Sequence, residues 1–224
     1  METSNTLFGG IFGAFVVSCG AMVLLPNSQI GNLNPVTPDW DGTQLSVTNA
    51  YPDEQQHVGR AVYVANGCFY CHSQQVRDPQ YGPDLERGWG VRRTVARDYL
   101  YEDVPMLGSS RIGPDFANYG SNTWRNEPLD DPKKPEQRDA TWIYRHMYNP
   151  KTIVSDSKCP PQPFLFVRKH ISGTPSPDAA HVDGRYEWIP TAEMRDLAAY
   201  ILGQDRSFPV PEAPTVITPP EEKK

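Results

Sequence analysis

Residues 67–72 read Gly67-Cys68-Phe69-Tyr70-Cys71-His72, and the last five of them form a C-x-x-C-H motif. This is the pattern by which a protein chain covalently captures a c-type haem. The short spacing lets both thiols add to the vinyl groups of one porphyrin, and the adjacent imidazole can bind the iron from the same side. The motif therefore predicts one covalent haem c, attached through Cys68 and Cys71, with His72 as an iron ligand.

Two other kinds of site also use a C-x-x-C pair, namely a zinc site and a thioredoxin-like dithiol. A structural zinc site needs two further cysteine or histidine ligands at short spacing. The remaining cysteines are Cys19, which lies in an apolar run, and Cys159, which stands alone. A redox dithiol normally lies in a βαβ unit, whereas the flanks of this motif have helix and loop patterns. The adjacent histidine favours the haem interpretation.

The run LFGGIFGAFVVSCGAMVLL at residues 7–25 contains no charged side chain. As a helix it would be about 28 Å long, against a hydrocarbon core of about 30 Å. A secretory signal peptide would carry a basic segment before a shorter apolar stretch, but the only charge ahead of this run is Glu2. Residues 16–19 loosely resemble a lipoprotein cleavage box, yet the apolar run continues beyond them. We therefore expect an uncleaved transmembrane anchor.

The charge pattern cannot orient this anchor, because no lysine or arginine occurs before Arg60. Attachment of haem c takes place outside the cytoplasm, so we expect residues 27–224 to lie on the periplasmic side of a bacterial inner membrane. Gly9 and Gly13 form a G-x-x-x-G pair, which would permit close packing with another membrane helix. Small residues are also common in membrane helices in general, so both interpretations stay open.

Beyond the anchor, the composition is that of one soluble domain rich in loops, since the chain holds 23 prolines and has a net charge of −6. This acidity argues against a nucleic-acid partner. We divide the chain into an anchor at 1–26, a linker at 27–51, a haem domain at 52–206 and a proline-rich tail at 207–224. Residues 121–138 have the composition of a charged loop insertion.

Helical patterns occur in three stretches of the domain. Apolar side chains recur at helical spacing in residues 52–66 and again in residues 191–203. A third helix is expected at 140–148, where Asn149-Pro150 ends the pattern. We expect the first two helices to pack against each other, with Gly59 allowing a close approach, and loops to make up the rest.

Further sequence blocks follow the haem motif in a fixed order: S-Q-Q-V-R at 73–77, E-R-G-W-G at 86–90, S-R-I-G-P-D at 110–115, Trp142 with His146, and P-P-Q-P-F-L-F at 160–166. Together with the motif and the anchor, this set resembles the mono-haem subunit, subunit II, of the C-type (cbb-type) haem-copper cytochrome c oxidases. The resemblance covers most of the chain. It implies a mostly α fold, in which one N-terminal transmembrane helix is followed by a periplasmic class I cytochrome c-like domain with long loops.

The resemblance implies an electron-transfer subunit of a membrane-bound cytochrome c oxidase, without an active site of its own. Its single haem c would pass electrons to a separate catalytic haem-copper subunit, which reduces oxygen. The electron donor would be a further cytochrome c subunit or a soluble cytochrome c. Two alternatives stay open: the membrane-anchored cytochrome c subunit of a nitric oxide reductase, and a haem-based sensor or ligand-binding module.

The resemblance also implies roles for two residues of the 110–115 block. In related cytochromes the carbonyl of the proline in a G-P-x-x block accepts a hydrogen bond from the proximal imidazole, and Pro114 is the matching residue. Such a bond fixes the ring and raises its donor strength. Arg111 would face a haem propionate. The alternatives are an ordinary loop proline and a solvated arginine.

The sixth iron ligand is the position at which this sequence departs from the family pattern. The family has a methionine just before the P-P-x-x-F-L block, and here that position holds Cys159. A thioether ligand raises the reduction potential of the iron, whereas an anionic thiolate lowers it. Cys159 is the first candidate by position, and an open or water-ligated iron is the next. Weaker candidates are Met106, Met147, Met194, His146, His170 and His181.

Overall fold

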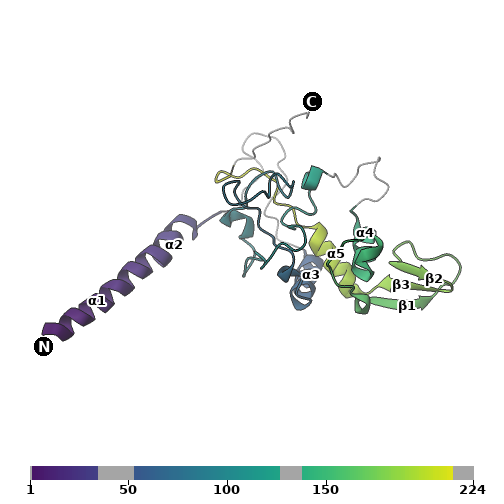
Figure 1. The fold of residues 1–224 in the computed structure, drawn as a ribbon, viewed down its shortest axis with the longest axis horizontal. Helices are drawn as coiled ribbons and strands as arrows, with labels where there is room; N and C mark the ends of the chain where they lie inside the picture. The colour runs from purple at the N-terminus through teal and green to yellow at the C-terminus, as the bar shows by residue number, and fades with distance from the viewer. Residues whose placement is uncertain (1, 35–52, 127–137, 214–224) are drawn as a thin grey trace, which may run out of the picture.

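The computed structural model describes residues 2–34, 53–126 and 138–213. Figure 1 shows one long helix at the N-terminal end, from which a folded domain extends. The helices of that domain lie in its middle, and a small sheet lies at the end far from the N-terminal helix. Most of the expected linker, most of the expected insertion and the end of the expected tail lie outside the described residues.

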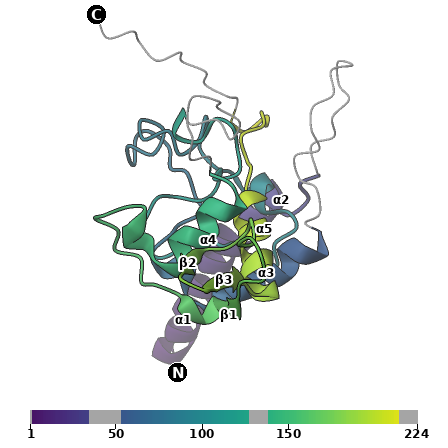
Figure 2. The ribbon, with the colours of Figure 1, turned by 90° about the vertical axis from the view of Figure 1, so that its right-hand side faces the viewer.

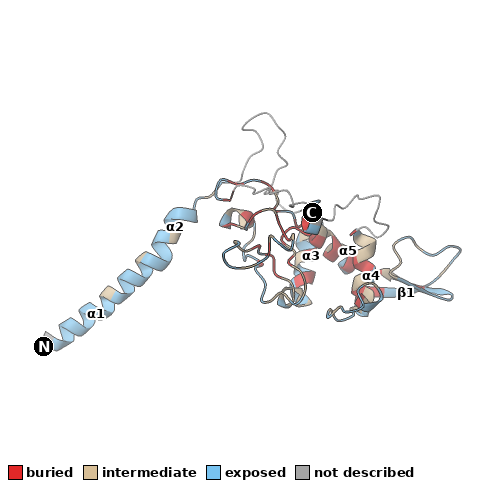
Figure 3. Ribbon diagram, turned by 45° about the horizontal axis from the view of Figure 1, so that its top comes forward, coloured by how far each residue is buried: buried red, intermediate tan, exposed pale blue. Residues whose placement is uncertain are grey.

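The N-terminal helix begins with α1, Glu2–Cys19, continues through a π-helical turn at Gly20–Leu24, and ends with α2, Leu25–Ile30. Its side chains are almost entirely exposed, as the pale-blue rod in Figure 3 shows. The segment Thr3–Ile30 is long and apolar enough to cross a membrane. The structure therefore supports the expected span, and the helix continues past the end of the apolar run to Ile30.

The longer helices of the folded domain are α3, Glu54–Ala65, α4, Ala140–Tyr148, and α5, Ala192–Leu202. All three were expected from the sequence, and their ends agree closely with the expected ones. Short 3₁₀ turns occupy Cys68–Tyr70, Ala96–Tyr99, Trp124–Asn126, Pro150–Thr152 and Pro163–Leu165. Long loops connect these elements, so the expectation of a mostly helical domain with long loops is confirmed for the described residues.

Helices α3 and α5 pack against each other in the middle of the domain (Figure 1). Each begins at a side chain that caps its first turn, Asp53 for α3 and Thr191 for α5. A Cβ atom at Gly59 would lie 1.9 Å from the backbone oxygen of Asp196 in α5, so the crossing requires a residue without a side chain. The expected helix pair and the role of Gly59 in it are confirmed.

A three-stranded antiparallel sheet was not expected from the sequence. It consists of β1, Phe166–His170, β2, His181–Asp183, and β3, Tyr186–Pro190, in the order β1-β3-β2. Figure 2 looks onto the domain from the sheet end. Four of the five residues of β1 are exposed, so its sequence shows no alternation of buried and exposed positions that would mark a strand. The expectation of loops throughout this region was wrong.

The core forms where α3, α4 and α5 meet, and Figure 3 shows its buried residues in red. The rings of Tyr63 in α3 and Tyr200 in α5 meet edge to face, with centroids 5.3 Å apart. The Tyr63 hydroxyl donates a hydrogen bond to the carbonyl of His72 over 3.1 Å. The Tyr200 hydroxyl pairs with the side-chain amide of Gln74, whose nitrogen lies 3.0 Å away. The helix pair is thus tied directly to the segment that begins at His72.

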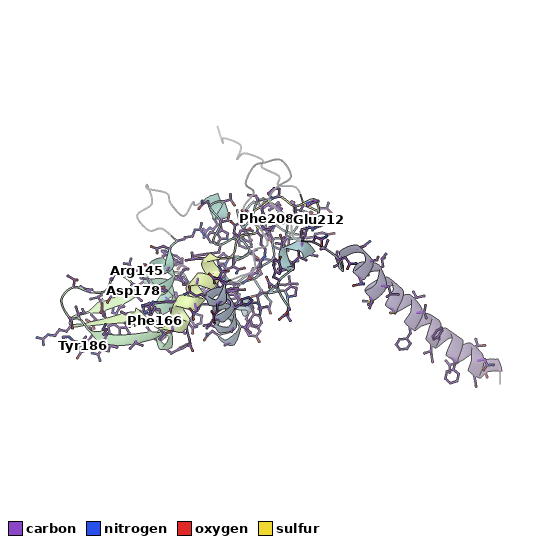
Figure 4. All side chains as sticks on the ribbon, turned by 180° about the vertical axis from the view of Figure 1, so that it is seen from behind. Arg145, Phe166, Asp178, Tyr186, Phe208 and Glu212 are labelled. Carbon is purple, nitrogen blue, oxygen red and sulfur yellow. The ribbon has the colours of Figure 1, made fainter. Side chains whose placement is uncertain are left out.

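Residues 207–213, which we call the C-terminal strap, run from α5 toward the end of the N-terminal helix. Figure 4 labels Phe208 and Glu212 at this place. A small second core contains Phe208, Val210 and Ala213 of the strap together with Val95. Arg97 donates hydrogen bonds to the carboxylate of Glu212, with Nε 3.1 Å from each oxygen, and to the carbonyl of Asn34. One side chain therefore joins the strap to the segment that follows α2.

Candidate functional site

The imidazole of His72 is held by a backbone carbonyl. Its Nδ1 atom lies 2.8 Å from the oxygen of Pro114 and, because a carbonyl oxygen can only accept, Nδ1 carries the proton. Nε2 is then the nitrogen with the free lone pair. The ring stacks on Phe116 with centroids 3.9 Å apart. The structure thus contains the contact between His72 and Pro114 that the family resemblance implies.

Desolvation keeps the His72 ring neutral. It lowers the pKa of His72 to about 4, the hydrogen bond to Pro114 acts in the opposite direction, and the charge of His146 lowers the pKa further. At neutral pH the imidazole is therefore uncharged, which is the form that binds a metal ion.

Cys68 and Cys71 are free thiols on the short turn that follows α3. Gly67 precedes this turn with a φ of 67°, a left-handed conformation that favours glycine. The backbone N–H of His72 donates to the carbonyl of Cys68 over 3.0 Å, which closes the turn. Both thiols and the imidazole are thereby presented by one compact segment directly after a core helix.

Cys159 lies close to these two thiols although it comes much later in the chain. Burial raises the pKa of Cys68 to about 12, and the neighbouring Cys159 adds to the rise. Burial likewise raises the pKa of Cys159, with a further contribution from Cys71. These mutual effects indicate that Cys159 lies in the neighbourhood of the haem motif, and its role as an iron ligand stays a prediction.

His146 of α4 reaches the same place from another element. Its ring lies nearly parallel to that of Trp142, with centroids 4.9 Å apart, and burial lowers its pKa. The Nδ1 atom of His146 is buried and has no hydrogen-bond partner within the part of the chain that the structure describes. Buried polar atoms nearly always have a partner. This nitrogen therefore marks a position where a further group belongs.

The loop that carries Cys159 is closed onto the end of α4. The N–H of Val154 donates to the carbonyl of Pro150 over 2.9 Å, and the N–H of Gln162 donates to the carbonyl of Met147 over 2.8 Å. The second bond returns the chain to the residue beside His146. Cys159 therefore lies in a closed loop that begins at Met147, the residue after His146.

The other candidate ligands have structural surroundings of their own. The three methionines are buried in the main core, namely Met106, Met147 and Met194. His170 on β1 meets the ring of Tyr186, and His181 on β2 stacks on Tyr148. The two sheet histidines thus belong to the sheet, whereas Cys159 and His146 affect the pKa values of Cys68 and His72 respectively.

Arg111 is already engaged by protein groups. It donates to the carbonyl of Gln75 over 2.7 Å and lies 3.2 Å from a carboxylate oxygen of Asp84. Asp84 is fully buried and also forms an ion pair with Arg77 over 2.7 Å. The contact that the structure gives Arg111 is therefore a structural ion pair, and its role at a haem propionate stays a prediction.

Asp115 is a residue of the site that the sequence reasoning missed. Its fully buried carboxylate accepts hydrogen bonds from the hydroxyl of Ser73 over 2.6 Å and from two backbone N–H groups. The bond from Ser73 thus connects the residue after His72 with Asp115, the residue after Pro114. Asp115 thereby keeps the carbonyl of Pro114 at the imidazole. Its place directly after the G-P pair was the signal available in the sequence.

A comparison with protein families identifies the class of the protein as a subunit of cytochrome c oxidase. The matching family model is that of the cytochrome c oxidase mono-haem subunit, FixO, and it covers residues 11–177. The chain belongs to this family. A comparison with curated proteins found no match. The resemblance drawn from the sequence blocks is thus confirmed, and membership implies one haem and partner subunits in an oxidase complex.

Proposed function

We propose that this chain is the electron-transfer subunit of a cbb-type cytochrome c oxidase and passes electrons through one covalent haem c to a catalytic haem-copper subunit. Cys68 and Cys71 would form the thioether bonds, and His72 would be the proximal ligand. The observation that carries this proposal is the 2.8 Å hydrogen bond between His72 and Pro114. It leaves Nε2 of a neutral ring available to iron beside two free thiols.

The residues at this place fit a haem in two further respects. Gly113 lies so close to His72 that a Cβ atom there would be 2.2 Å from Cε1, so the chain keeps the ring edge clear and the ring fixed. The Nδ1 atom of His146 on α4 is buried and has no hydrogen-bond partner among the described residues, which suits a site that a further group completes. When bound, the haem supplies a one-electron redox centre, and the protein's part is to hold and orient it.

We infer that Cys159 is the distal ligand of the iron. Its position before the P-P-x-x-F-L block and its closeness to Cys68 and Cys71 support this role. Replacement by methionine would exchange a thiolate for a thioether, so we expect Cys159→Met to raise the midpoint potential. A redox titration checks this, and an unchanged potential with an unchanged ferric spectrum would remove Cys159 from the iron.

We place the N-terminal helix across the bacterial inner membrane and the haem domain in the periplasm. The span Thr3–Ile30 and the requirement of haem attachment for an extracytoplasmic compartment support this location. The electron donor would be a further cytochrome c subunit or a soluble cytochrome c. The match to a cytochrome c oxidase family favours this function over a nitric oxide reductase subunit or a haem-based sensor.

The test is purification of the full chain from membranes with any stable partners. We expect haem c in a one-to-one ratio with the polypeptide by pyridine haemochrome, and co-purification of a large subunit that contains haem and copper. The Cys68→Ser, Cys71→Ser double variant should lose covalent haem, whereas Cys19→Ser on the membrane helix should keep it. A mature polypeptide at its bare mass would refute the proposal.

A further inference from the structure

The four residues 72–75, which we call the proximal segment, belong to no helix or strand, yet other parts of the chain bond to their backbone. Ser73 and Gln74 are buried. The N–H of Gln74 donates to the carbonyl of Leu107 over 3.1 Å, and the carbonyl of Ser73 accepts from the N–H of Phe116 over 2.8 Å. A buried irregular segment needs such partners, because its backbone groups do not bond to one another as those of a helix do.

Two tyrosine hydroxyls bond to carbonyls of the proximal segment. The Tyr63 hydroxyl, on α3, donates to the carbonyl of His72 over 3.1 Å. The Tyr99 hydroxyl donates to the carbonyl of Gln74 over 2.6 Å. A carbonyl oxygen only accepts, so each hydroxyl is the donor. Tyr63 is the more informative of the two, because its side chain is fully buried and its acceptor belongs to the proposed iron ligand itself.

The packing of α3 on α5 fixes the position of the Tyr63 hydroxyl. The Tyr63 ring meets that of Tyr200 edge to face, and the Tyr200 hydroxyl in turn bonds to the side chain of Gln74. Gly59 lies one helical turn before Tyr63, and a Cβ atom there would lie 2.8 Å from the Cβ of Tyr200. The hydroxyl therefore reaches the carbonyl of His72 from the packed core of the domain.

Hydrogen bonds consequently hold His72 at two places, its backbone and its ring. Tyr63 bonds to the backbone carbonyl, and the carbonyl of Pro114 lies 2.8 Å from Nδ1 of the ring. With its backbone fixed, His72 can keep the short bond to Pro114 only within a narrow range of ring orientations. A buried carbonyl without its donor is unfavourable, so loss of the Tyr63 hydroxyl would shift this part of the chain.

We propose that Tyr63 is a positioning residue for the proximal ligand, because its hydroxyl anchors the backbone of His72 and thereby keeps the imidazole bonded to Pro114 and oriented toward the iron. Tyr99 supports the same segment at the carbonyl of Gln74. The proposal rests on the proposed function, in which His72 binds the haem iron, and deepens it. Tyr63 acts on the iron through His72.

Loss of the hydroxyl would change the redox behaviour of the site. The hydrogen bond from Nδ1 to a carbonyl raises the donor strength of the imidazole, and a stronger donor favours ferric iron. Without the anchor at its backbone, His72 would lengthen its bond to Pro114, and its donor strength would fall. The reduction potential should then rise, and the orientation of the ring over the haem should change.

The experiment compares Tyr63→Phe with the parent protein in the purified full-length complex. Phenylalanine keeps the ring packed against Tyr200 and removes only the hydroxyl. We expect covalent haem to be retained and the ferrous-to-ferric ratio at a fixed ambient potential to rise about threefold, which is about 28 mV for one electron. The g values of the ferric haem in electron paramagnetic resonance should shift. Tyr144→Phe makes the same chemical change at a buried tyrosine of α4 and should alter neither measurement.

Thermal unfolding separates a positioning role from packing alone. A Tyr63→Phe protein that unfolds at a lower temperature but keeps the parental potential and g values would overturn the proposal, because the hydroxyl would then serve stability only. An equal shift in Tyr144→Phe would also overturn it. Tyr99→Phe should raise the potential by a smaller amount. If Tyr63→Phe yields no folded protein, Tyr99→Phe decides the matter, and an unchanged potential there would count against the proposal.

The proposed function fails in a distinguishable way. If the parent protein carries no covalent haem, the oxidase assignment of this site falls before any variant is compared. If the parent protein carries haem c and Tyr63→Phe keeps the parental potential and g values, only the role of Tyr63 falls, and the haem assignment stands.

Discussion

Gly113 is a residue whose identity follows from the imidazole beside it. A Cβ atom here would lie 2.2 Å from Cε1 of His72, closer than any real contact. We expect Gly113→Ala to displace the ring from the carbonyl of Pro114 and to lower the haem-to-polypeptide ratio several-fold. Absorbance of the purified protein measures this ratio. Ile112→Ala, at an exposed neighbour, is the control, and equal haem content in both variants would show that the ring position is not critical.

Asp84 should make the stability of the domain depend on pH at the acid end. Burial raises its pKa, but hydrogen bonds from Arg77 and the charge of Arg111 lower it by more, so the net pKa lies below the ordinary value. A depressed folded-state pKa gives stability that is present above the unfolded pKa of about 3.9 and is lost as the pH falls. We expect the free energy of unfolding to decline below about pH 4.

Urea unfolding as a function of pH measures this decline. Asp84→Asn should remove most of the acid slope and cost about 2 kcal/mol at neutral pH, because two arginines lose a charged partner. Asp156→Asn, at an exposed aspartate, should keep the slope. An unaltered slope in the Asp84 variant would show that other carboxylates dominate acid unfolding.

Site residues could be predicted from the sequence where residues that lie close together in the structure also lie close together in one sequence motif. The spacing within the haem motif predicts Cys68, Cys71 and His72 as haem-binding residues, and the G-P pair, through the family resemblance, predicts the contact of Pro114 with His72 that the structure contains. The buried Nδ1 atom of His146 could not be predicted in this way, because its burial depends on packing between segments that are distant in the sequence. The ion pair of Arg111 with Asp84 was hidden for the same reason.

At the level of secondary structure, the crossing of α3 and α5 depends on Gly59. A side chain there would meet backbone atoms of Asp196, which cannot move away as the end of a side chain can. We expect Gly59→Ala to destabilise the protein by about 2 kcal/mol, even though alanine is the better helix former by about 1 kcal/mol. Thermal unfolding measures the loss. Gln55→Ala on the exposed side of α3 should have little effect, and a stabilised Gly59 variant would contradict this packing.

The three helices were predictable because their signals are local: periodic apolar side chains, caps and a following proline. The sheet was not, because pairing of β1 with β3 joins segments separated by a long connection. The short β2 has no buried residue, so its pattern does not differ from that of a loop. A strand is recognisable from the sequence when one face is buried, and here the exposed faces removed that signal.

At the scale of the whole molecule, Arg97 connects the C-terminal strap with the segment that follows the N-terminal helix. We expect Arg97→Gln to leave the haem spectrum unchanged and to lower global stability by less than about 1 kcal/mol, since the pair is near the surface. The strap should exchange its amide hydrogens several-fold faster, as measured by mass spectrometry. Arg87→Gln, at an exposed arginine, should leave that exchange unaltered.

The length of the N-terminal helix has a consequence for where the redox centre would stand. The apolar run ends at Leu25, and the helix continues through α2 to Ile30. At 1.5 Å per residue, the five residues 26–30 form a stalk of about 7.5 Å. If the apolar run fills the bilayer as proposed, this stalk would hold the folded domain above the lipid headgroups. Electron exchange would then occur with proteins that protrude to that height, and lipid composition should alter its rate little.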